Sequence, residues 1–260
     1  MNMKNVALIT GASSGIGLQL AKIHASKGGD LVLVARRKEE LERLSEDLRS
    51  KFNIQTVVIP VDLMEPHASV EVYNKVKELG IEVDILINNA GLGGYGNFHE
   101  RELKKELDMI QLNITALTEL THLIVQDMVR RKKGKILNTA STAGMLPGPL
   151  QTVYYATKAY VLSFSQGISH ELKKHGITVT ALCPGPVQTG FEKEAGMAGS
   201  GLFKNAASAE STAKKGYAAM QRGKLVEITD GRLSFALNWI VPFAPRKMVL
   251  AMVEKMQTVK

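Results

Sequence analysis

The sequence has little of several residues that would point to particular classes of protein. It contains one cysteine, Cys183, so no internal disulfide can form, and a lone thiol fits a reducing compartment. Cys183 ends the apolar run 178–183, which favours a buried structural thiol over a nucleophile. The six histidines are scattered, and no cysteine and histidine cluster has the spacing of a metal site. We therefore expect neither disulfide nor metal chemistry.

Long apolar runs are also lacking. No uncharged apolar stretch reaches the ~18 residues that a membrane-spanning helix needs. Residues 1–10 do not have the pattern of a targeting signal, so we expect a cytoplasmic protein. The net charge of +8 raises the question of a nucleic-acid partner, but the basic runs 36–38 and 130–133 have no interleaved aromatic residues. We expect no nucleic acid and assign the charge to attracting an anionic cofactor or substrate.

Short apolar, β-branched runs instead alternate with longer helical patterns along the whole chain. Runs of this kind suit parallel strands that are covered on both faces, and the alternation indicates right-handed βαβ units. No linker or low-complexity segment interrupts it, so residues 1–260 are expected to form one domain. We predict an α/β, Rossmann-like doubly wound sheet of about seven parallel strands, with helices on both faces. The expected strands are 6–10, 31–35, 56–61, 85–89, 135–140, 178–183 and 225–229, and the main helices are 15–26, 39–51, 66–79, 102–131 and 152–175.

A glycine-rich segment follows the first expected strand and opens the first helix. It reads Thr10-Gly11-Ala12-Ser13-Ser14-Gly15-Ile16-Gly17. Glycines allow a tight turn and a close approach of the backbone, and a helix N-terminus attracts a pyrophosphate. The spacing differs from G-x-G-x-x-G and a plain turn is the alternative, but the position after the first strand favours dinucleotide binding.

The end of the second strand indicates which dinucleotide is bound. Asp30 lies at the distance of an expected ribose-binding carboxylate but precedes the strand, so it is at the wrong end. Arg36 and Arg37 leave the strand instead. Two guanidinium groups without a carboxylate favour NADP(H) over NAD(H), with ordinary surface arginines as the alternative.

Tyr154 and Lys158 are four residues apart and therefore share a helix face. A tyrosine with its ordinary pKa near ~10 exchanges protons slowly at neutral pH, and a neighbouring cation lowers that pKa. Ser141, thirteen residues before Tyr154, can supply a second donor to a substrate oxygen. Taken alone, the pair is weak evidence, and a solvated helix face is the favoured interpretation until the rest of the chain is considered.

Three features occur together in this sequence: the glycine loop, Asn88-Asn89-Ala90-Gly91 after the fourth strand, and Ser141 with Tyr154 and Lys158. Because of these features, the sequence resembles the short-chain dehydrogenase/reductase family in its single-domain form. The resemblance covers residues 4 to about 229. It extends to Pro184-Gly185-Pro186-Val187-Gln188-Thr189, which would lie beside a nicotinamide, and to Asp62-Leu63, which would line the adenine pocket. One departure is Ala140, where the family often has a serine.

The resemblance implies a role for each catalytic residue. Tyr154 would exchange the proton of the substrate oxygen, Lys158 would lower the pKa of Tyr154 and hold the nicotinamide ribose, and Ser141 would orient the substrate. Asn113 matches the family asparagine of a proton relay, and a mid-helix asparagine also needs a reason; an exposed polar residue is its alternative. The family spacing selects Tyr154 over Tyr155, which we expect to pack against the body or a partner. A homodimer or homotetramer through helices 102–131 and 152–175 is implied by the resemblance alone.

The expected substrate end lies outside the carboxyl ends of the strands. Segments 92–98, 143–150 and 190–207 meet there, and the last has the length of a functional lid. Lys193 and Lys204 are interpreted as solvated lysines. The apolar residues of these segments indicate a substrate with hydrophobic surface: Met145, Leu146, Leu150, Phe191, Met197, Leu202 and Phe203.

Residues 233–260 form a hydrophobic C-terminal extension interrupted by Pro242 and Pro245. Its uncharged run 233–245 is too short to span a bilayer. We expect a terminal strand and helix packed on the domain or on another subunit. The alternative is an amphipathic surface anchor or a lid for a lipid-like substrate.

Taken together, these features predict an NADP(H)-dependent oxidoreductase that interconverts a ketone and a secondary alcohol on a partly hydrophobic small molecule. A non-catalytic dinucleotide-binding or redox-sensing scaffold is the alternative, because a fold alone does not establish function. Ser141, Tyr154, Lys158 and Asn113 argue against it, since binding alone needs neither Ser141 nor Tyr154. Epimerisation or dehydration is a third option, usually found on longer chains with a separate substrate domain.

Overall fold

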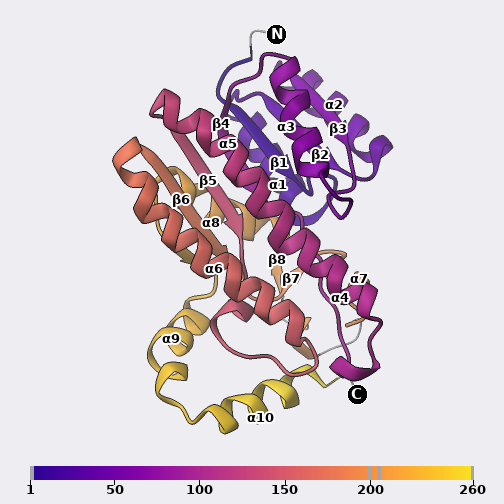
Figure 1. The fold of residues 1–260 in the computed structure, drawn as a ribbon, viewed down its shortest axis with the longest axis vertical. Helices are drawn as coiled ribbons and strands as arrows, with labels where there is room; N and C mark the ends of the chain where they lie inside the picture. The colour runs from indigo at the N-terminus through magenta and orange to yellow at the C-terminus, as the bar shows by residue number, and fades with distance from the viewer. Residues whose placement is uncertain (1–2, 198–200, 204–205, 259–260) are drawn as a thin grey trace.

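The computed structural model describes residues 3–197, 201–203 and 206–258. Within these residues, seven strands form one parallel sheet in the order β3-β2-β1-β4-β5-β6-β9 (Figure 1). The predicted fold class is confirmed. The strands are β1 (Val6–Thr10), β2 (Leu31–Ala35), β3 (Thr56–Pro60), β4 (Val83–Asn88), β5 (Gly134–Thr139), β6 (Ile177–Cys183) and β9 (Val226–Ile228). Two short parallel strands, β7 (Val187–Gln188) and β8 (Ala207–Ser208), pair beside this sheet.

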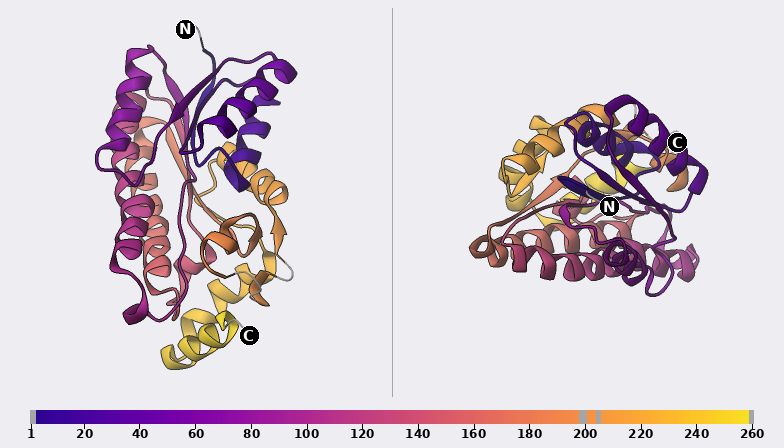
Figure 2. Two further views of the ribbon diagram at one scale, coloured as in Figure 1. Left: turned by 90° about the vertical axis from the view of Figure 1, so that its right-hand side faces the viewer. Right: turned by 90° about the horizontal axis from the view of Figure 1, so that it is seen from above.

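The five inner strands are almost fully buried because helices cover both faces of the sheet, whereas the edge strands β3 and β9 are mostly half-buried (Figure 2). Alternate residues of β1 point to opposite faces: Ala7 and Ile9 pack into one core cluster, while Val6 and Leu8 pack into another. The first face is covered by α1 (Gly15–Ala25), α2 (Lys38–Phe52) and α8 (Ala209–Gln221). The second is covered by α3 (Ala68–Glu78), α5 (Leu117–Arg131) and α6 (Thr152–Leu172).

The order of the strands reverses between β1 and β4. Strands β2 and β3 extend from β1 in one direction, and β5, β6 and β9 extend from β4 in the other. At such a switch point the loops after the strands separate and leave a crevice. The glycine loop after β1 and the loop after β4 therefore border the same opening.

The structure has helical residues over nearly all of the expected helix 102–131, but they do not form one continuous α-helix. The segment consists of α4 (Leu103–Ile110), a π-helical segment (Gln111–Ala116) and α5. A π segment widens the helix by one residue and often marks a functional site, but its position depends on tertiary contacts rather than on local propensity. Asn113 lies within it.

The described part of the C-terminal extension, up to residue 258, contains no strand, so that part of our prediction is wrong. It forms α9 (Gly231–Trp239), a 3₁₀ turn (Val241–Phe243) and α10 (Arg246–Gln257). The Asp230 carboxylate caps α9 by accepting hydrogen bonds from the backbone N–H groups of Arg232 (2.8 Å) and Leu233 (3.0 Å). Both helices lie beyond the carboxyl ends of the strands (Figures 1 and 2). We call residues 231–257 the cap. No helix among the described residues is long and apolar enough to cross a membrane.

Candidate active site

The glycine loop is shaped by positions where only glycine fits. Gly11 and Gly15 have φ of +66° and +54°, a conformation that side chains disfavour. A Cβ on Gly17 would lie 2.3 Å from the carbonyl oxygen of Gly11 and 2.5 Å from Nδ2 of Asn89. The loop therefore packs directly on the start of α1, and its backbone is open to the cavity at the N-terminus of that helix.

The loops after β1 and β4 are locked together. The Thr10 hydroxyl accepts hydrogen bonds from the backbone N–H groups of Asn89 and Ala90, both at 3.0 Å. The Asn89 amide donates in return to the carbonyl oxygens of Thr10 (3.2 Å) and Gly11 (3.4 Å). These reciprocal bonds fix the floor of the crevice at the switch point.

Arg36 and Arg37 lie at the rim of the same cavity, at the end of β2. Arg37 donates to the Ser13 hydroxyl at 3.1 Å, and Arg36 lies 3.9 Å from an Asp62 carboxylate oxygen. Asp30 is at the opposite end of β2, where it accepts from the backbone of Lys4 and Gln55, so its exclusion as a ribose ligand is right. The cationic rim is available to an anion on the ribose.

Asn113 is buried, with 1% of its surface exposed, so the alternative of an exposed polar residue is wrong. Its amide exchanges two hydrogen bonds of 2.9 Å with the backbone N–H and carbonyl of Leu92, and also donates to the Thr157 hydroxyl at 3.0 Å. A Cβ on Gly91 would lie 3.3 Å from both Asn113 Oδ1 and Lys158 Nζ. Asn113 thus joins the loop after β4 to α6 directly behind the site.

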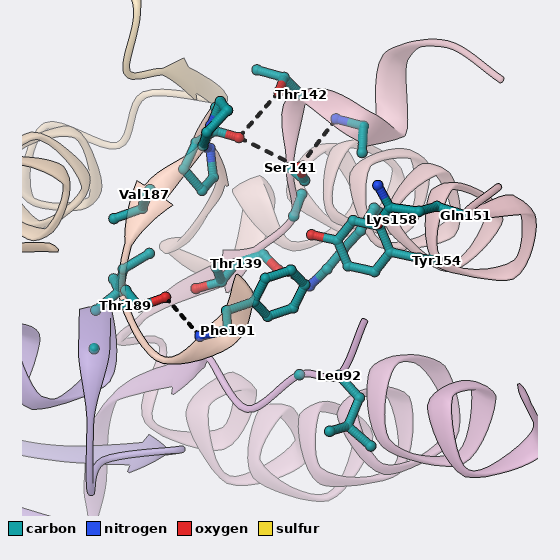
Figure 3. Close-up of a pocket in the computed structure, with 18 of the residues that line it drawn as sticks. Leu92, Thr139, Ser141, Thr142, Gln151, Tyr154, Lys158, Val187, Thr189 and Phe191 are labelled. Atoms are coloured by element: carbon teal, nitrogen blue, oxygen red, sulfur yellow. Dashed lines mark hydrogen bonds between the residues drawn. The ribbon is translucent and has the colours of Figure 1, made fainter. Parts of the chain in front are cut away.

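Ser141, Tyr154 and Lys158 converge on one pocket (Figure 3). Ser141 follows β5, accepts from the Ala143 backbone N–H at 3.1 Å, and lies within hydrogen-bonding reach of the Tyr154 hydroxyl. Lys158 Nζ donates to the Thr139 carbonyl oxygen at 2.8 Å and lies 5.9 Å from the centre of the Tyr154 ring. The helix spacing and the end of β5 therefore bring the three predicted residues together.

Burial governs the protonation of this group. It raises the pKa of Tyr154 to about 12, with a smaller lowering from the hydrogen bond to Ser141. Burial also lowers the pKa of Lys158 to about 8. The expected lowering of the Tyr154 pKa by Lys158 is absent, because burial dominates for both groups. Tyr154 is consequently a neutral phenol at pH 7, able to donate a proton.

Cys183 is the buried thiol that the sequence predicts. It has no exposed surface and ends β6 within the core. Burial raises its pKa to about 12, so it carries no thiolate at neutral pH. A nucleophilic role is thereby excluded.

Tyr155 packs against the body, as expected, and is bound to the cap. Its hydroxyl accepts a hydrogen bond of 2.9 Å from the Gln257 side chain, and Gln257 Oε1 accepts one of 2.6 Å from Gln151. Gln257 is 1% exposed at the last turn of α10. We call these three residues the glutamine latch, because they tie the cap to the start of α6, one residue from Tyr154.

One cavity of about 810 Å³ runs from the glycine loop past Tyr154 to the cap. Nearly all predicted cofactor residues line it. They are Gly11, Ser13, Ser14, Gly15, Ile16, Arg36, Arg37, Asp62, Leu63, Asn89, Ala90, Gly91, Tyr154, Lys158, Pro184, Gly185, Val187 and Thr189. Gly17 and Asn113 lie behind the wall, where they shape it without lining it.

The expected lid contributes the apolar part of this wall. Phe191, at the start of α7 (Phe191–Glu194), lies with its ring centre 5.4 Å from that of Tyr154 (Figure 3). Leu146, Met197, Leu202 and Phe203 also line the cavity, whereas Met145, Leu150 and Lys193 do not. Lys204 lies outside the described residues, as do parts of segment 190–207.

Our main expectation for residues 233–260 did not include a contribution of the cap to the cavity wall, although the alternative of a lid did. Apolar side chains of α9, α10 and the 3₁₀ turn between them close the end of the cavity beyond Tyr154: Leu233, Ala236, Leu237, Val241, Met252, Val253 and Met256. The apolar spacing of residues 249 and 253 on α10 was a signal for a buried helix face. Nothing in the sequence pointed to the glutamine latch.

Comparison with known proteins places this site in a family. A family model described as short chain dehydrogenase matches residues 5–198. A very-long-chain 3-oxoacyl-CoA reductase from Homo sapiens is 37% identical over 196 residues, a match that covers 72% of this chain and 61% of that protein. This chain thus spans under two thirds of the length of that relative.

Solved structures match over almost the whole chain. A short-chain dehydrogenase from Sphingobium yanoikuyae in complex with NADPH has a TM-score of 0.84 at 32% identity, covering 92% of this chain and 93% of that one. A bulky-bulky ketone specific alcohol dehydrogenase from Comamonas testosteroni has a TM-score of 0.78 at 30% identity, covering 94% and 96%. The family match and the fold agree with the geometry around Tyr154, and this chain belongs to the short-chain dehydrogenase family.

Proposed function

We propose that this oxidoreductase uses NADP(H) to interconvert a ketone and a secondary alcohol on a substrate with substantial hydrophobic surface. The observation that carries the proposal is the position of Tyr154. Its hydroxyl, paired with Ser141, lies in the one cavity that joins the glycine loop to the apolar cap.

The residues along the first half of the cavity fit a nicotinamide dinucleotide. Only glycine fits at Gly11, Gly15 and Gly17, so backbone N–H groups at the start of α1 can approach a pyrophosphate closely. Asp62 and Leu63 line the cavity where they would border the adenine, and Pro184, Gly185, Pro186, Val187 and Thr189 line it where they would border the nicotinamide. When bound, the nicotinamide gives hydride to a carbonyl carbon or takes it from an alcohol carbon.

The chain's own residues handle the proton and the orientation of the substrate. In reduction, Tyr154 donates its hydroxyl proton to the carbonyl oxygen as that oxygen gains charge. Ser141 donates a second hydrogen bond to the same oxygen and fixes its direction. Lys158, charged below a pKa of about 8, stabilises the phenolate that forms on Tyr154. In oxidation the proton moves from the alcohol to Tyr154.

Arg36 and Arg37 support NADP(H) as the cofactor. They lie at the end of β2, where a ribose 2′-phosphate would be bound, and the Asp62 carboxylate, which also lines the cavity, lies 3.9 Å from the Arg36 guanidinium. The related structure from Sphingobium yanoikuyae was determined with NADPH.

The second half of the cavity supports a hydrophobic ketone. Phe191, Leu202, Phe203 and the apolar side chains of the cap surround the space beyond Tyr154. Relatives named as acting on very-long-chain 3-oxoacyl-CoA and on bulky-bulky ketones agree with such a substrate. The cytoplasmic location stays a prediction from the sequence.

The test is oxidation of NADPH and NADH against a panel of aliphatic, aromatic and 3-oxoacyl ketones. Tyr154→Phe should lower kcat by a factor of ~10²–10⁴ with NADPH binding retained. Tyr155→Phe, the same change one residue along, should keep most of the activity. A chain that binds NADPH tightly but reduces no ketone would favour the scaffold alternative.

The same assay tests the cofactor. Replacing both arginines, Arg36→Ser with Arg37→Ser, should lower the preference for NADPH over NADH by roughly a hundredfold or more, because each of the two charged hydrogen bonds contributes about 1.5–3 kcal/mol. The matched control is Arg130→Ser on the surface of α5. An unchanged NADPH/NADH ratio in the double variant would show that the two arginines do not read the 2′-phosphate.

A further inference from the structure

The cap exposes more large apolar side chains than any other part of the described chain. Phe243 is 82% exposed and Trp239 69%, and four more apolar residues of the cap are also exposed by about half or more of their surface: Phe235, Ile240, Met248 and Met256. On α10 the exposed and buried rows are separate: residues 248, 252 and 256 face outward, while residues 249, 253 and 257 face the protein. An exposed apolar row of this kind on an amphipathic helix indicates a surface that binds another protein or a membrane.

The charges around this surface are strongly one-sided. Residues 231–257 carry four cations and a single anion, Glu254. The cations are Arg232, Arg246, Lys247 and Lys255. All four are exposed, and none forms an ion pair with another described residue. Free cations beside exposed aromatic and aliphatic side chains complement a lipid surface that carries negative headgroups.

A second copy of the chain fits this surface less well. A two-fold contact would bring the same unpaired cations together, with one acidic residue per cap to offset them. A different apolar face, formed on and before α4 by Phe98, Leu103, Leu107 and Ile110, is also available to a second copy. That face carries salt-bridged charges, as in the pair of Lys104 with Asp108.

The cap surface is continuous with the cavity. Met252 and Met256 both face outward and line the cavity wall, and Leu237 lines it from α9. The cap also lies at the end of the molecule beyond the strands, away from the glycine loop (Figures 1 and 2). A hydrophobic molecule that leaves a bilayer under the cap would therefore enter the cavity at its apolar end.

We propose that the cap docks on the surface of an anionic lipid bilayer, with Trp239 and Phe243 inserted among the acyl chains and the four cations at the headgroups. The bilayer thereby presents hydrophobic ketones to the cavity. This assignment departs from the expectation that the segment packs on the domain or on another subunit. Docking on the bilayer concerns binding alone and stands whether or not the ketone chemistry is confirmed, whereas the presentation of ketones rests on the proposed function.

Trp239 gives a direct readout, because it is the only tryptophan in the chain. The full chain is mixed with vesicles of phosphatidylcholine alone, or of phosphatidylcholine with phosphatidylserine, without cofactor or substrate. Docking should shift the fluorescence emission of Trp239 to shorter wavelength. In flotation, the protein should move with the vesicles that contain phosphatidylserine. Loss of roughly fivefold in affinity per removed cation is expected, and added salt should weaken binding.

Two variants and two controls sharpen the test. Phe235→Ser with Phe243→Ser, which keeps Trp239, and Arg246→Gln with Lys247→Gln should each reduce vesicle binding. The matched controls are Phe98→Ser with Leu107→Ser before and on α4, and Lys173→Gln with Lys174→Gln at the far end of α6. Both controls should bind vesicles like the unaltered chain. NADPH binding, measured for every variant, shows that the fold is intact.

Three outcomes would overturn the proposal. The first is a chain that floats with neither kind of vesicle. The second is equal loss of binding in the cap variants and in the controls. The third is a self-associating chain, seen by sedimentation velocity, that becomes monomeric only in the cap variants; a second copy would then cover this surface. Vesicle flotation, Trp239 emission and sedimentation velocity do not depend on ketone turnover, so failure of turnover would leave them unaffected.

Discussion

The two ends of the cavity are built in different ways. At the cofactor end, backbone atoms touch one another, as at Gly17 and the carbonyl oxygen of Gly11, and Thr10 and Asn89 lock two loops by reciprocal hydrogen bonds. At the cap end, apolar side chains from α9 and α10 surround an open space, and the glutamine latch is the polar tie to α6. The first end admits little change of shape, whereas the second can be repacked.

This difference separates two demands on the enzyme. The dinucleotide presents the same pyrophosphate and ribose in every turnover, so a backbone cradle of fixed shape can bind it. A hydrophobic substrate is recognised by side-chain volume, and apolar surfaces tolerate exchange of one residue for another of similar size. Substitutions should therefore act abruptly at the glycine loop and gradually at the cap.

Among the substitutions that compare the two ends of the cavity, the largest effect is expected from Gly17→Ala. The added Cβ would meet the backbone carbonyl of Gly11 and the side-chain amide of Asn89, which is held by its own hydrogen bonds to Thr10 and Gly11, so the loop must shift. Overpacking of about 1–3 kcal/mol corresponds to a loss of roughly fivefold to 150-fold in NADPH affinity. Fluorescence titration with NADPH and thermal unfolding with and without it provide the measurements.

Gly167→Ala is the matched control for that change. Gly167 also lies inside a helix, α6, but an added Cβ would meet nothing within 4 Å. It should leave NADPH affinity unchanged and raise stability by about 0.5–1 kcal/mol through helix propensity. Equal NADPH affinities for the two alanine variants would mean that the cradle is not rigid.

The rigid end was also the end that the sequence could predict. Parallel strands bring their carboxyl ends to one edge, so Gly11, Asn89, Ser141 and Pro184, each just after a strand, had to meet there. Asn113 could be singled out because asparagine is a poor residue for a helix interior. The π segment around Asn113 could not be predicted, because the Asn113 side chain forms its hydrogen bonds with Leu92 and Thr157, which lie in distant elements.

The cap resisted prediction for equally specific reasons. Residues 233–245 form a short, nearly uncharged apolar run, and periodicity alone does not distinguish a strand from a helix in such a run. Asp230 ahead of it was an available N-cap signal for the helix that forms. Gln257 carried no signal at all, since its partners on α6 are more than 100 residues away in the chain.

Lys158 lies where the two ends meet, and its ionisation tests that boundary. Burial lowers its pKa to about 8, so the ammonium is present below that pH and is lost as the pH rises through it. Tyr154, with a pKa of about 12, stays protonated over the same range. The value of kcat/KM for NADPH, which reports ionisations of the free enzyme, should therefore fall about tenfold per pH unit above pH 8.

Lys158→Arg separates this explanation from titration of another group. A guanidinium keeps its charge to high pH, so the fall in kcat/KM should move upward even if the maximal rate is lower. The profile is measured between neutral and alkaline pH, with circular dichroism to confirm that the fold persists. A fall at the same pH in the arginine variant would assign it to a group other than Lys158.

The smallest effect is expected at the cap, from Gln257→Leu. The change keeps the side-chain volume but removes the hydrogen bonds to Gln151 and Tyr155, each of which contributes about 1 kcal/mol. Water from the cavity can replace part of this contribution. The cap should loosen, so KM for a hydrophobic ketone rises by about fivefold, while kcat and NADPH affinity change little. The control, Gln166→Leu on the exposed side of α6, should leave KM unchanged. A parallel loss of NADPH affinity in the Gln257 variant would show that the two ends of the cavity are coupled rather than separate.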